Sequence, residues 1–520
     1  MKNDLEQKLR RGEPLTGLRL THVDLAGVDL AGADLSGVHL ERVSLRGAKL
    51  AGARLGGARL FGCDLREVDL SGARLEDVVA VQCALAGARL DGAELRRTSL
   101  PGADLSGASL VDAKLVEVAA PKANLAGADL HGSTLEGAQL LGADLRWTRG
   151  PTSIVRSMLD GARFGAASLA GTALDGNDFD GAALGGVDFR GASLQRASFR
   201  GAALAGARFD GCDLEGAVFQ GADLSGATFV DARLYGVCFL ETRLAGVDLS
   251  GRVLELAFFE GADLSGARLA GATLITCSLS RARLDGADLS GALLRKVTLE
   301  GATFEGAKLD GLAFEEVRFD ERSARAFDHR RAHRVRCGFA ELALRGLDFS
   351  GADLTGASFH GADLSGVKFD LATLTQANLL GADLSGASLR GITAKAACFG
   401  EANCKDVDLS QARLRFANFA DASLDGAKLI EADLREVIFA RATAVAASFA
   451  GANLGFADLA HAVLDRADLT GADLDRASLH ATRSDRALWV GASLATVKGT
   501  DAARAKAEAW RMPPRERGAA

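Results

Sequence analysis

The sequence predicts an all-β fold, a solenoid of four-sided parallel coils with a short helix at each end. The first observation is spacing: leucine recurs at every fifth position from Leu20 to Leu145 with few gaps, and a second register runs from Ile154 to Leu494. The second is composition, because 62 glycines and only 6 prolines in 520 residues indicate one repeated unit rather than several ordinary domains.

A period of five excludes a helix and favours short strands. On an α-helix each step of five positions turns about 500°, so the leucines would spiral round without forming a stripe. In a strand, the alanine and leucine of Ala-Asp-Leu point one way and the aspartate points the other. The next two residues must then turn a corner, where glycine tolerates a positive φ angle. Each pentapeptide is therefore predicted to be a three-residue strand followed by a bend.

Phenylalanine spacing predicts the number of sides. Phenylalanines occupy the inward position of every fourth pentapeptide in a first series, and a second series has the same spacing but is offset by two pentapeptides. A coil of four pentapeptides would stack both series into columns on opposite sides of the core, and stacked rings bury a large area. Coils of three or five sides would scatter them. The two series are Phe179, Phe199, Phe219, Phe239 and Phe259, and Phe189, Phe209 and Phe229.

The segments GADLSGARL, GANLGFADL and GADLDRASL resemble the pentapeptide repeat proteins, and the resemblance covers roughly residues 15–497. It implies a right-handed quadrilateral parallel β-helix. The central inward residue would be the leucine or phenylalanine, and the second inward residue the alanine two positions before it. Each coil of such a solenoid contacts only its neighbours, so both ends require caps.

The caps are expected to be helices. Asn3 or Asp4 is predicted to begin a short N-terminal helix, and Thr500 a helix over 501–511 whose Trp510 covers the last coil. The complete division is a capping helix at 1–13, pentapeptide blocks at 14–148, 149–320 and 339–497, a basic insertion at 321–338, and a C-terminal capping helix and tail at 498–520.

The repeat is interrupted near RWTRGPTSIV. Nine positions separate Leu145 from Ile154, so one residue is missing from the register. Either one repeat is four residues long, or the coil kinks at this point. Trp147 lies beside the break and is a candidate docking residue, and the alternative is a packed residue of the seam.

The basic insertion is the second interruption. Phe319 and Phe339 are four pentapeptides apart, so the segment is either one distorted coil or a projecting helix or loop that preserves the register. Its function would be to contact an acidic partner or phosphate, and the alternative is a solvated excursion. Together with Trp147, the candidate partner-binding residues are Arg322, Arg325, Arg330, Arg331, Arg334 and Arg336.

Neither metal nor enzyme chemistry is expected. His329, His333 and Cys337 have a spacing of four that resembles metal ligands on a helix, but Cys337 fills an inward position and a fourth ligand is not evident. P-loop, dinucleotide-binding and HExxH motifs are absent. A core of leucine, phenylalanine and alanine leaves no cavity for a substrate, so no cofactor is expected.

Charge and hydropathy narrow the class of partner. The net charge of −7 is mild for this length, which makes nucleic acid an unlikely partner. No run of about 18 apolar residues exists, so no membrane span is expected. The N-terminal segment lacks the apolar centre of a signal peptide, and a cytoplasmic protein is the expectation.

Three functions are compatible with these features. The first is a non-catalytic scaffold for protein–protein interaction. The opening LRRGEPLTGLRLTHVDLAGVDLAG resembles stand-alone pentapeptide proteins associated with type VI secretion. That resemblance implies an accessory or adaptor protein that acts on the VgrG–PAAR spike or its effector.

The second function is a DNA-mimicking protein that binds DNA gyrase or topoisomerase, since the family contains such regulators. Those proteins carry a coherent acidic face, whereas segments such as GARLGGARL here interleave arginine with aspartate. The third is a secreted effector carrier, although no separate toxin domain lies outside the repeats. Dimerisation end to end is also compatible with a stack of coils.

Overall fold

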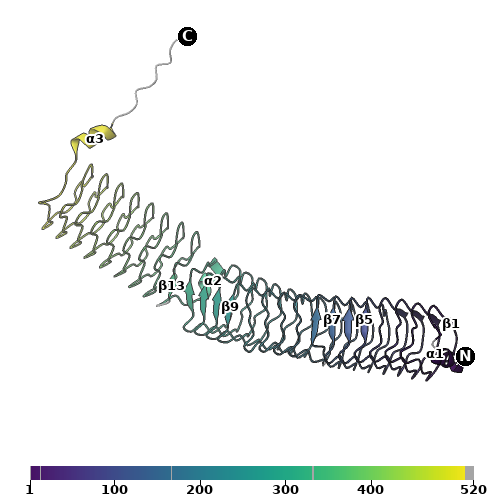
Figure 1. Cartoon of the computed structure of the whole chain (residues 1–520). Helices are drawn as coiled ribbons and strands as arrows, with labels where there is room; N and C mark the ends of the chain where they lie inside the picture. The colour runs from purple at the N-terminus through teal and green to yellow at the C-terminus, as the bar shows by residue number, and fades with distance from the viewer. Residues whose placement is uncertain (1, 12, 166, 331–332, 510–520) are drawn as a thin grey trace, which may run out of the picture. The chain divides into compact units, whose positions relative to one another are not determined.

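The structure is a computed structural model that describes residues 2–11, 13–165, 167–330 and 333–509. The chain forms two compact units. The N-terminal unit contains Met1–Ser290 and Phe304–Lys308, and the C-terminal unit contains Gly291–Thr303 and Leu309–Ala520. Each unit consists of stacked coils (Figure 1). Among the described residues, no helix is long and apolar enough to cross a membrane.

The pentapeptide folds as predicted, as a short strand and a bend. In residues 261–265, Ala262 and Leu264 are buried, while Asp263 between them faces outward and is half-buried. Gly266 at the following bend has a φ angle of 63°. This is the left-handed region that glycine adopts without a steric penalty, so the frequent glycines mark the corners.

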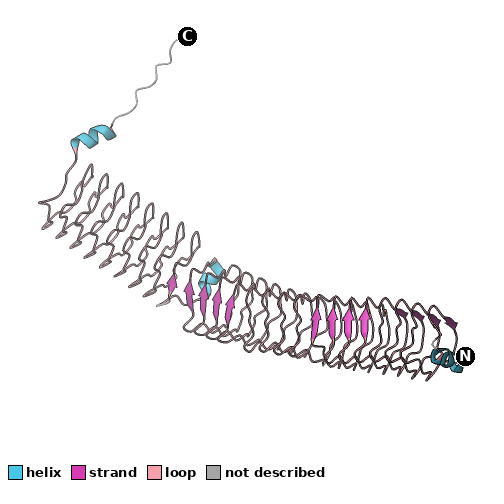
Figure 2. Ribbon diagram, viewed as in Figure 1, coloured by secondary structure: helices cyan, strands magenta, loops and turns pink. Residues whose placement is uncertain are grey.

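Backbone pairing confirms that four pentapeptides make one coil, which therefore has four sides. The first strand, β1 (Arg19–Thr21), pairs in parallel with β2 (His39–Glu41), which places Leu20 against Leu40, its counterpart four repeats later. Further ladders of this kind are drawn as neighbouring arrows in Figure 2, and single parallel bridges at the same spacing join the rest of the coils. The predicted all-β parallel β-helix is the fold of this chain.

The named strands are each two or three residues long, because each side of a coil is that short. One sheet of the N-terminal unit contains β1 to β4, a second contains β5 to β8, and β9 pairs with β10; in the C-terminal unit β12 pairs with both β11 and β13. The bounds of the remaining strands are β3 (Arg59–Phe61), β4 (Val79–Val81), β5 (Glu94–Arg96), β6 (Lys114–Val116), β7 (Thr134–Glu136), β8 (Ser153–Val155), β9 (Val253–Glu255), β10 (Thr273–Ile275), β11 (Leu293–Arg295), β12 (Ala313–Glu315) and β13 (Arg334–Val335).

The two predicted phenylalanine columns are present. Phe179 and Phe199 stack with ring centroids 4.9 Å apart and an interplanar angle of 5°. Phe189 and Phe209 do the same at 5.0 Å. The columns meet edge to face, as between Phe199 and Phe209 at 6.2 Å and 81°. Both arrangements are favoured geometries for aromatic pairs, so the columns connect successive coils through the core.

At the first interruption, one repeat is four residues long. This is the first of the two alternatives for this segment, which were a four-residue repeat and a kinked coil. Arg149 pairs with Asp129 before it and with Ser168 after it, so Gly150 takes the inward position of the repeat. A Cβ atom on Gly150 would overlap the carbonyl oxygen of Ser168. The next residue, Pro151, is buried, and this coil, which we call the short coil, closes with one residue fewer than its neighbours.

The basic insertion is one distorted coil that contains a short helix, α2 (Glu321–Ala326). Asp320 caps this helix: its side chain accepts a hydrogen bond from the Ser323 N–H, and the Ser323 hydroxyl accepts one from the Asp320 N–H. The side chains of Phe327 and His329 then enter the core. The Phe319 and Phe339 rings stack at 4.8 Å, so the register is preserved.

The N-terminal cap is a helix, α1 (Lys2–Arg10), and it includes Asn3 and Asp4. The prediction that one of these two residues begins the helix was therefore wrong. Leu5 of this helix is buried and lines a cavity of about 20 Å³ together with Leu15 and Leu20 of the first coils. The helix thus covers apolar side chains at this end, as a cap must.

The C-terminal helix differs from its prediction. The helix α3 (Ala502–Glu508) begins after Asp501, whose Oδ1 accepts hydrogen bonds from two N–H groups of the first turn, and none of its residues is buried. Leu494 of the last coil stays 43% exposed. The described part of the predicted cap therefore does not cover the last coil, and Trp510 lies outside the described residues.

Candidate interaction surface

The interior cavities found among the described residues are too small for a ligand. Two cavities in the N-terminal unit have volumes of about 20 Å³ each and are lined by leucine, valine and alanine side chains. Such a volume admits at most a water molecule. Larger hollows of about 320 and 330 Å³ are open at the surface. The larger hollows described for this chain therefore lie on the outside of the coils.

Arg334 is not part of an accessible basic surface, contrary to the prediction. It pairs with Phe314 of the previous coil, so its side chain occupies the inward position and is only 2% exposed. The guanidinium lies 3.9 Å from the centre of the Phe314 ring and donates to the carbonyl oxygen of His333. Loss of solvent lowers the pKa of Arg334 to about 10.

Four other predicted arginines lie at the surface, and three of them have local partners. Arg325 lies 3.8 Å from Glu321, Arg330 pairs with Asp328 at 2.7 Å, and Arg336 contacts Glu315 and Glu316 at 2.9 and 3.1 Å. Arg322 is exposed, and in the described part of the chain no hydrogen bond or ion pair involves its side chain. Arg331 lies outside the described residues. Three of the six predicted arginines are therefore paired with carboxylates of the same chain.

His329, His333 and Cys337 do not share a helix face, because α2 ends at Ala326. His329 and Cys337 are buried, whereas His333 is exposed and lies 3.3 Å from Asp353. Burial lowers the pKa of His329 from 6.5 to about 4, so the ring is neutral at physiological pH.

Trp147 lies at the surface beside the short repeat and is 62% exposed. Its φ angle is 57°, a conformation that costs a bulky residue free energy. The Arg146 guanidinium lies 4.8 Å from the centre of the indole, and Arg146 is itself paired with Asp144 at 2.7 Å. The indole is therefore accessible to a partner and is held beside a cation.

The C-terminal unit carries a second exposed aromatic feature, which we call the aromatic corner and define as Lys395, Arg415, Phe416, Phe456 and Arg476. Phe416 and Phe456 stand at the second bend position, where glycine is usual. Their φ angles are 65° and 60°, and they are 41% and 54% exposed. Cations lie over both rings: Arg415 at 4.7 Å and Lys395 at 5.8 Å from Phe416, and Arg476 at 5.4 Å from Phe456.

The coils fix the spacing within the aromatic corner. Phe416, Glu436, Phe456 and Arg476 stand at the same corner of successive coils, so the two rings are two coils apart, about 10 Å. Glu436 between them accepts a hydrogen bond from Arg415 at 2.6 Å. Sequence reasoning missed this feature, although the signal was visible: LRF and LGF place phenylalanine where LSG places glycine.

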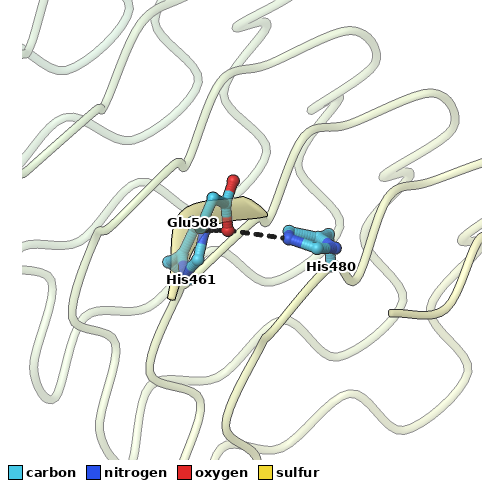
Figure 3. Close-up of side chains that lie close together, drawn as sticks. All are labelled: His461, His480 and Glu508. Carbon is cyan, nitrogen blue, oxygen red and sulfur yellow. Dashed lines mark hydrogen bonds and ion pairs between the residues drawn. The ribbon is translucent and has the colours of Figure 1, made fainter. Parts of the chain in front are cut away.

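A third cluster joins α3 to the last coils. His461 and His480 lie at one corner of successive coils, and Glu508 is the final residue of α3 (Figure 3). The Nε2 atoms of both histidines lie 3.0 Å from the same oxygen of Glu508, Oε2. The Nδ1 atom of His480 accepts a hydrogen bond from the Asp501 N–H at 3.1 Å. These contacts lower the pKa of Glu508 to about 2, chiefly through His480 and Arg504.

The chain was compared with curated proteins, solved structures and models of protein families. No curated protein matches the chain. Among solved structures, HetL, a pentapeptide repeat protein involved in heterocyst differentiation regulation from Nostoc sp. strain PCC 7120, is 28% identical, with 60% of this chain and 96% of HetL covered and a TM-score of 0.16. QnrB1, a plasmid-mediated fluoroquinolone resistance protein, is 17% identical over 51% of this chain and 91% of its own, with a TM-score of 0.17.

Another similar structure is Rfr23, a pentapeptide repeat protein from Cyanothece, at 25% identity, with 28% of this chain and 97% of Rfr23 covered and a TM-score of 0.14. The family model for pentapeptide repeats (8 copies) matches residues 15–42, 39–77, 81–117, 122–149, 159–196, 197–236, 242–281, 282–320, 337–370, 369–391, 402–439 and 446–483. These segments contain most of the chain and the coils described above. The chain belongs to the pentapeptide repeat family.

Proposed function

We propose that this chain is a non-catalytic scaffold that binds other proteins through its outer surface. The observation that carries the proposal is the aromatic corner. Phe416 and Phe456 are exposed in a backbone conformation that costs on the order of 1–2 kcal/mol for a residue with a side chain. Positive φ angles recur at the second bend position along the described chain, so the distinguishing feature of Phe416 and Phe456 is the exposed ring. Exposed aromatic residues with nearby arginine are also typical of protein interfaces.

Protein is favoured over nucleic acid as the partner because charges of both signs alternate on the surface. Many outward arginines pair with a carboxylate on a neighbouring coil, as Arg283 does with Asp263 at 2.5 Å and Arg441 with Asp421 at 2.6 Å, each on the coil before. A nucleic-acid surface needs unpaired cations along a continuous track. A DNA mimic needs a continuous acidic one, so the mixed surface also disfavours the gyrase-binding alternative.

The specific form of the proposal is an accessory protein of a type VI secretion system that acts in the cytoplasm on the VgrG–PAAR spike or its effector. Its support is the resemblance of the opening segment at residues 9–32 to proteins of that group. The contact surfaces would be the aromatic corner, Trp147 and the exposed arginines of the basic coil, Arg322, Arg325, Arg330 and Arg336.

The test is capture of partners from lysate of the source cell on the immobilised protein. The comparison variant is Phe416→Gly with Phe456→Gly, because glycine removes the rings and relieves the positive φ angles without disturbing the fold. Leu371→Gly is the matched control, since Leu371 is 75% exposed at the same bend position with a φ angle of 61°. Charge-reversing variants of Arg322 and Arg330 test the basic coil without removing it, whereas deletion of residues 321–338 would remove nearly a complete coil.

Retention of spike proteins or effectors by the wild type and Leu371→Gly, but not by the double glycine variant, is the expected result. Retention of gyrase subunits instead would replace the adaptor proposal with the gyrase-binding alternative. Loss of spike proteins only with the arginine variants would move the contact to the basic coil. If the wild type retains no protein that the matrix alone does not, the scaffold proposal is wrong.

A further inference from the structure

We propose that His461, His480 and Glu508 form a binding site for a divalent transition-metal ion of the zinc class. This inference is independent of the proposed function. Each residue offers one ligand atom, and the three atoms lie within 4.8 Å of one another. The two imidazoles point at one carboxylate oxygen from different coils (Figure 3). Two histidines and one carboxylate are a known ligand set for zinc that leaves the fourth position to water.

The fold holds the two histidines in place before any ion binds. His461 stands at the second bend position with a φ angle of 59°, and His480 follows the buried Leu479 at the first bend position of the next coil. The His461 N–H donates to the carbonyl oxygen of His480 at 2.8 Å, which fixes the distance between the two corners. A site whose ligands are already ordered loses less entropy when the ion binds.

Two of the three distances between ligand atoms are close to those of an occupied site. Zinc bonds are about 2.0–2.1 Å to histidine nitrogen and about 2.0–2.2 Å to a carboxylate oxygen, so neighbouring ligand atoms of a tetrahedral ion are about 3.3–3.5 Å apart. Both nitrogen–oxygen distances here are 3.0 Å. Moving Glu508 slightly away from the rings would admit the ion. The side chains of His461 and Glu508 are partly exposed, which leaves an entry path.

The hydrogen bonds of His480 determine what else must change. Its Nδ1 accepts the Asp501 N–H, so in the absence of metal the ring carries its proton on Nε2 and donates it to Glu508. A metal ion on Nε2 requires that this proton move to Nδ1. The Asp501 N–H would then face the new Nδ1–H of His480, so the hydrogen bond between Asp501 and His480 must break. Ligating histidines usually donate their second N–H to a carbonyl or carboxylate oxygen.

Metal binding is therefore coupled to the start of α3. Asp501 is the N-cap of this helix, so displacement of its backbone N–H alters the first turn while Glu508, at the last turn, becomes bound to the ion. The three ligands also determine which metal ions bind. Imidazole nitrogen favours zinc, nickel, cobalt and copper, whereas magnesium and calcium prefer oxygen ligands.

The test is calorimetric titration of the chelator-treated full chain with Zn²⁺, with Mg²⁺ and Ca²⁺ as comparison ions. Cys238→Ser and Cys398→Ser are introduced first, because these two cysteines are the least buried and thiolates also bind zinc. We expect one Zn²⁺ per chain and no binding of the comparison ions. His461→Ala, His480→Ala and Glu508→Gln should each weaken binding by more than about tenfold.

His360→Ala is the matched control, because His360 is exposed on the same unit away from the cluster and should leave the affinity unchanged. Replacement of zinc by Co²⁺ gives a second readout, since tetrahedral nitrogen and oxygen ligands produce visible absorption that is lost in the same three variants. Amide signals of Asp501 to Arg504 should shift when Zn²⁺ is added. Absence of binding, or equal binding by wild type and the three variants, would overturn the proposal.

Discussion

At the scale of the residue, the same side chain has opposite consequences at neighbouring positions. Phe419 fills an inward position and stacks on Phe399 at 4.4 Å, whereas Phe416, three positions earlier, stands exposed at a bend. The first contributes buried apolar area to the core. The second costs backbone strain and leaves its ring partly exposed, with the cations of Arg415 and Lys395 over it.

This difference predicts contrasting effects on stability. Phe419→Ala should reduce the free energy of unfolding by about 3–5 kcal/mol, as for other buried phenylalanines. Phe416→Gly should change it by no more than about 1 kcal/mol, because relief of the positive φ angle offsets the lost cation contact. Urea unfolding followed by circular dichroism measures both. A large loss for Phe416→Gly would mean that this ring is part of the fold rather than free for binding.

Gly150 predicts a steric effect at the short repeat. Its φ angle is not in the left-handed region, so the constraint is space: a methyl group would overlap the Ser168 carbonyl oxygen and approach Leu169 to 3.2 Å. Gly150→Ala should therefore cost about 1–3 kcal/mol. The matched control is Gly56→Ala, where the nearest atoms are 3.9 Å from the added carbon, and its thermal midpoint should stay within a few degrees of wild type.

At the scale of the element, the coil that contains α2 stabilises the fold in a pH-dependent way. His329 lies between Phe319, Phe339 and Phe349, and donates from Nε2 to the Ala324 carbonyl oxygen at 2.5 Å. Its charged neighbours are Asp328 and Arg334, and burial is the dominant cause of its low pKa of about 4.

The direction of the pH effect follows from this pKa. The folded state binds a proton more weakly at His329 than the unfolded state does, so the stabilisation is complete above about pH 6.5 and is lost as the pH falls from there to 4. The loss should be on the order of 3 kcal/mol. Asp328, with a pKa lowered to about 2, loses its contribution only below 3.8, so the two windows separate. His329→Gln should reduce the dependence between pH 6.5 and 4 in urea titrations, and an unchanged slope would contradict this account. Asp160, whose pKa is raised to about 6 chiefly by burial, titrates in the same range and keeps its own contribution.

The sequence predicted the regular coils well and the basic coil poorly, for a physical reason. Leucine and phenylalanine at every fifth position determine which side chains face inward, and the missing residue near Trp147 was visible as a spacing of nine. The basic coil has no such apolar pattern, so the burial of Arg334 was not predicted. One signal was available: Arg334 stands one coil after Phe314 and one coil before Leu354, both inward residues.

The aromatic corner and the cluster of His461, His480 and Glu508 were harder to predict because they depend on contacts that do not repeat from coil to coil. Phe416 and Phe456 are recognisable only once the bend position is known to require a positive φ angle. His461 and His480 meet because their corners stack, but Glu508 reaches them through a helix whose path the repeat does not determine. The contacts that the sequence could not predict are therefore those that do not recur from coil to coil.

At the scale of the whole molecule, the coils should be removable in whole numbers. Each coil contacts only its neighbours, so stability is close to a sum over coils and their interfaces. Deletion of residues 201–220 joins Arg200 to Gly221 and places Phe199 one coil before Phe239, so the aromatic column continues. We expect this variant to keep its circular dichroism spectrum with a similar thermal midpoint.

Deletion of residues 201–205 is the matched control. It shifts every following pentapeptide by one side, so the backbone can still pair coil on coil, but Phe199 then lies one coil before Leu224 and the aromatic columns are interrupted. Its midpoint should fall clearly below that of the whole-coil deletion. Equal midpoints for the two deletions would mean that the aligned phenylalanine columns do not stabilise the fold.

The repetition of the coils has a consequence for recognition. A partner that contacted only the repeated positions would find many equivalent sites related by translation along the stack, and could occupy any of them with nearly the same affinity. A single binding register requires positions that break this translational symmetry. The short coil, the coil that contains α2 and the bends at Phe416 and Phe456 are such positions. Their irregularity distinguishes one place along the chain from all its near copies.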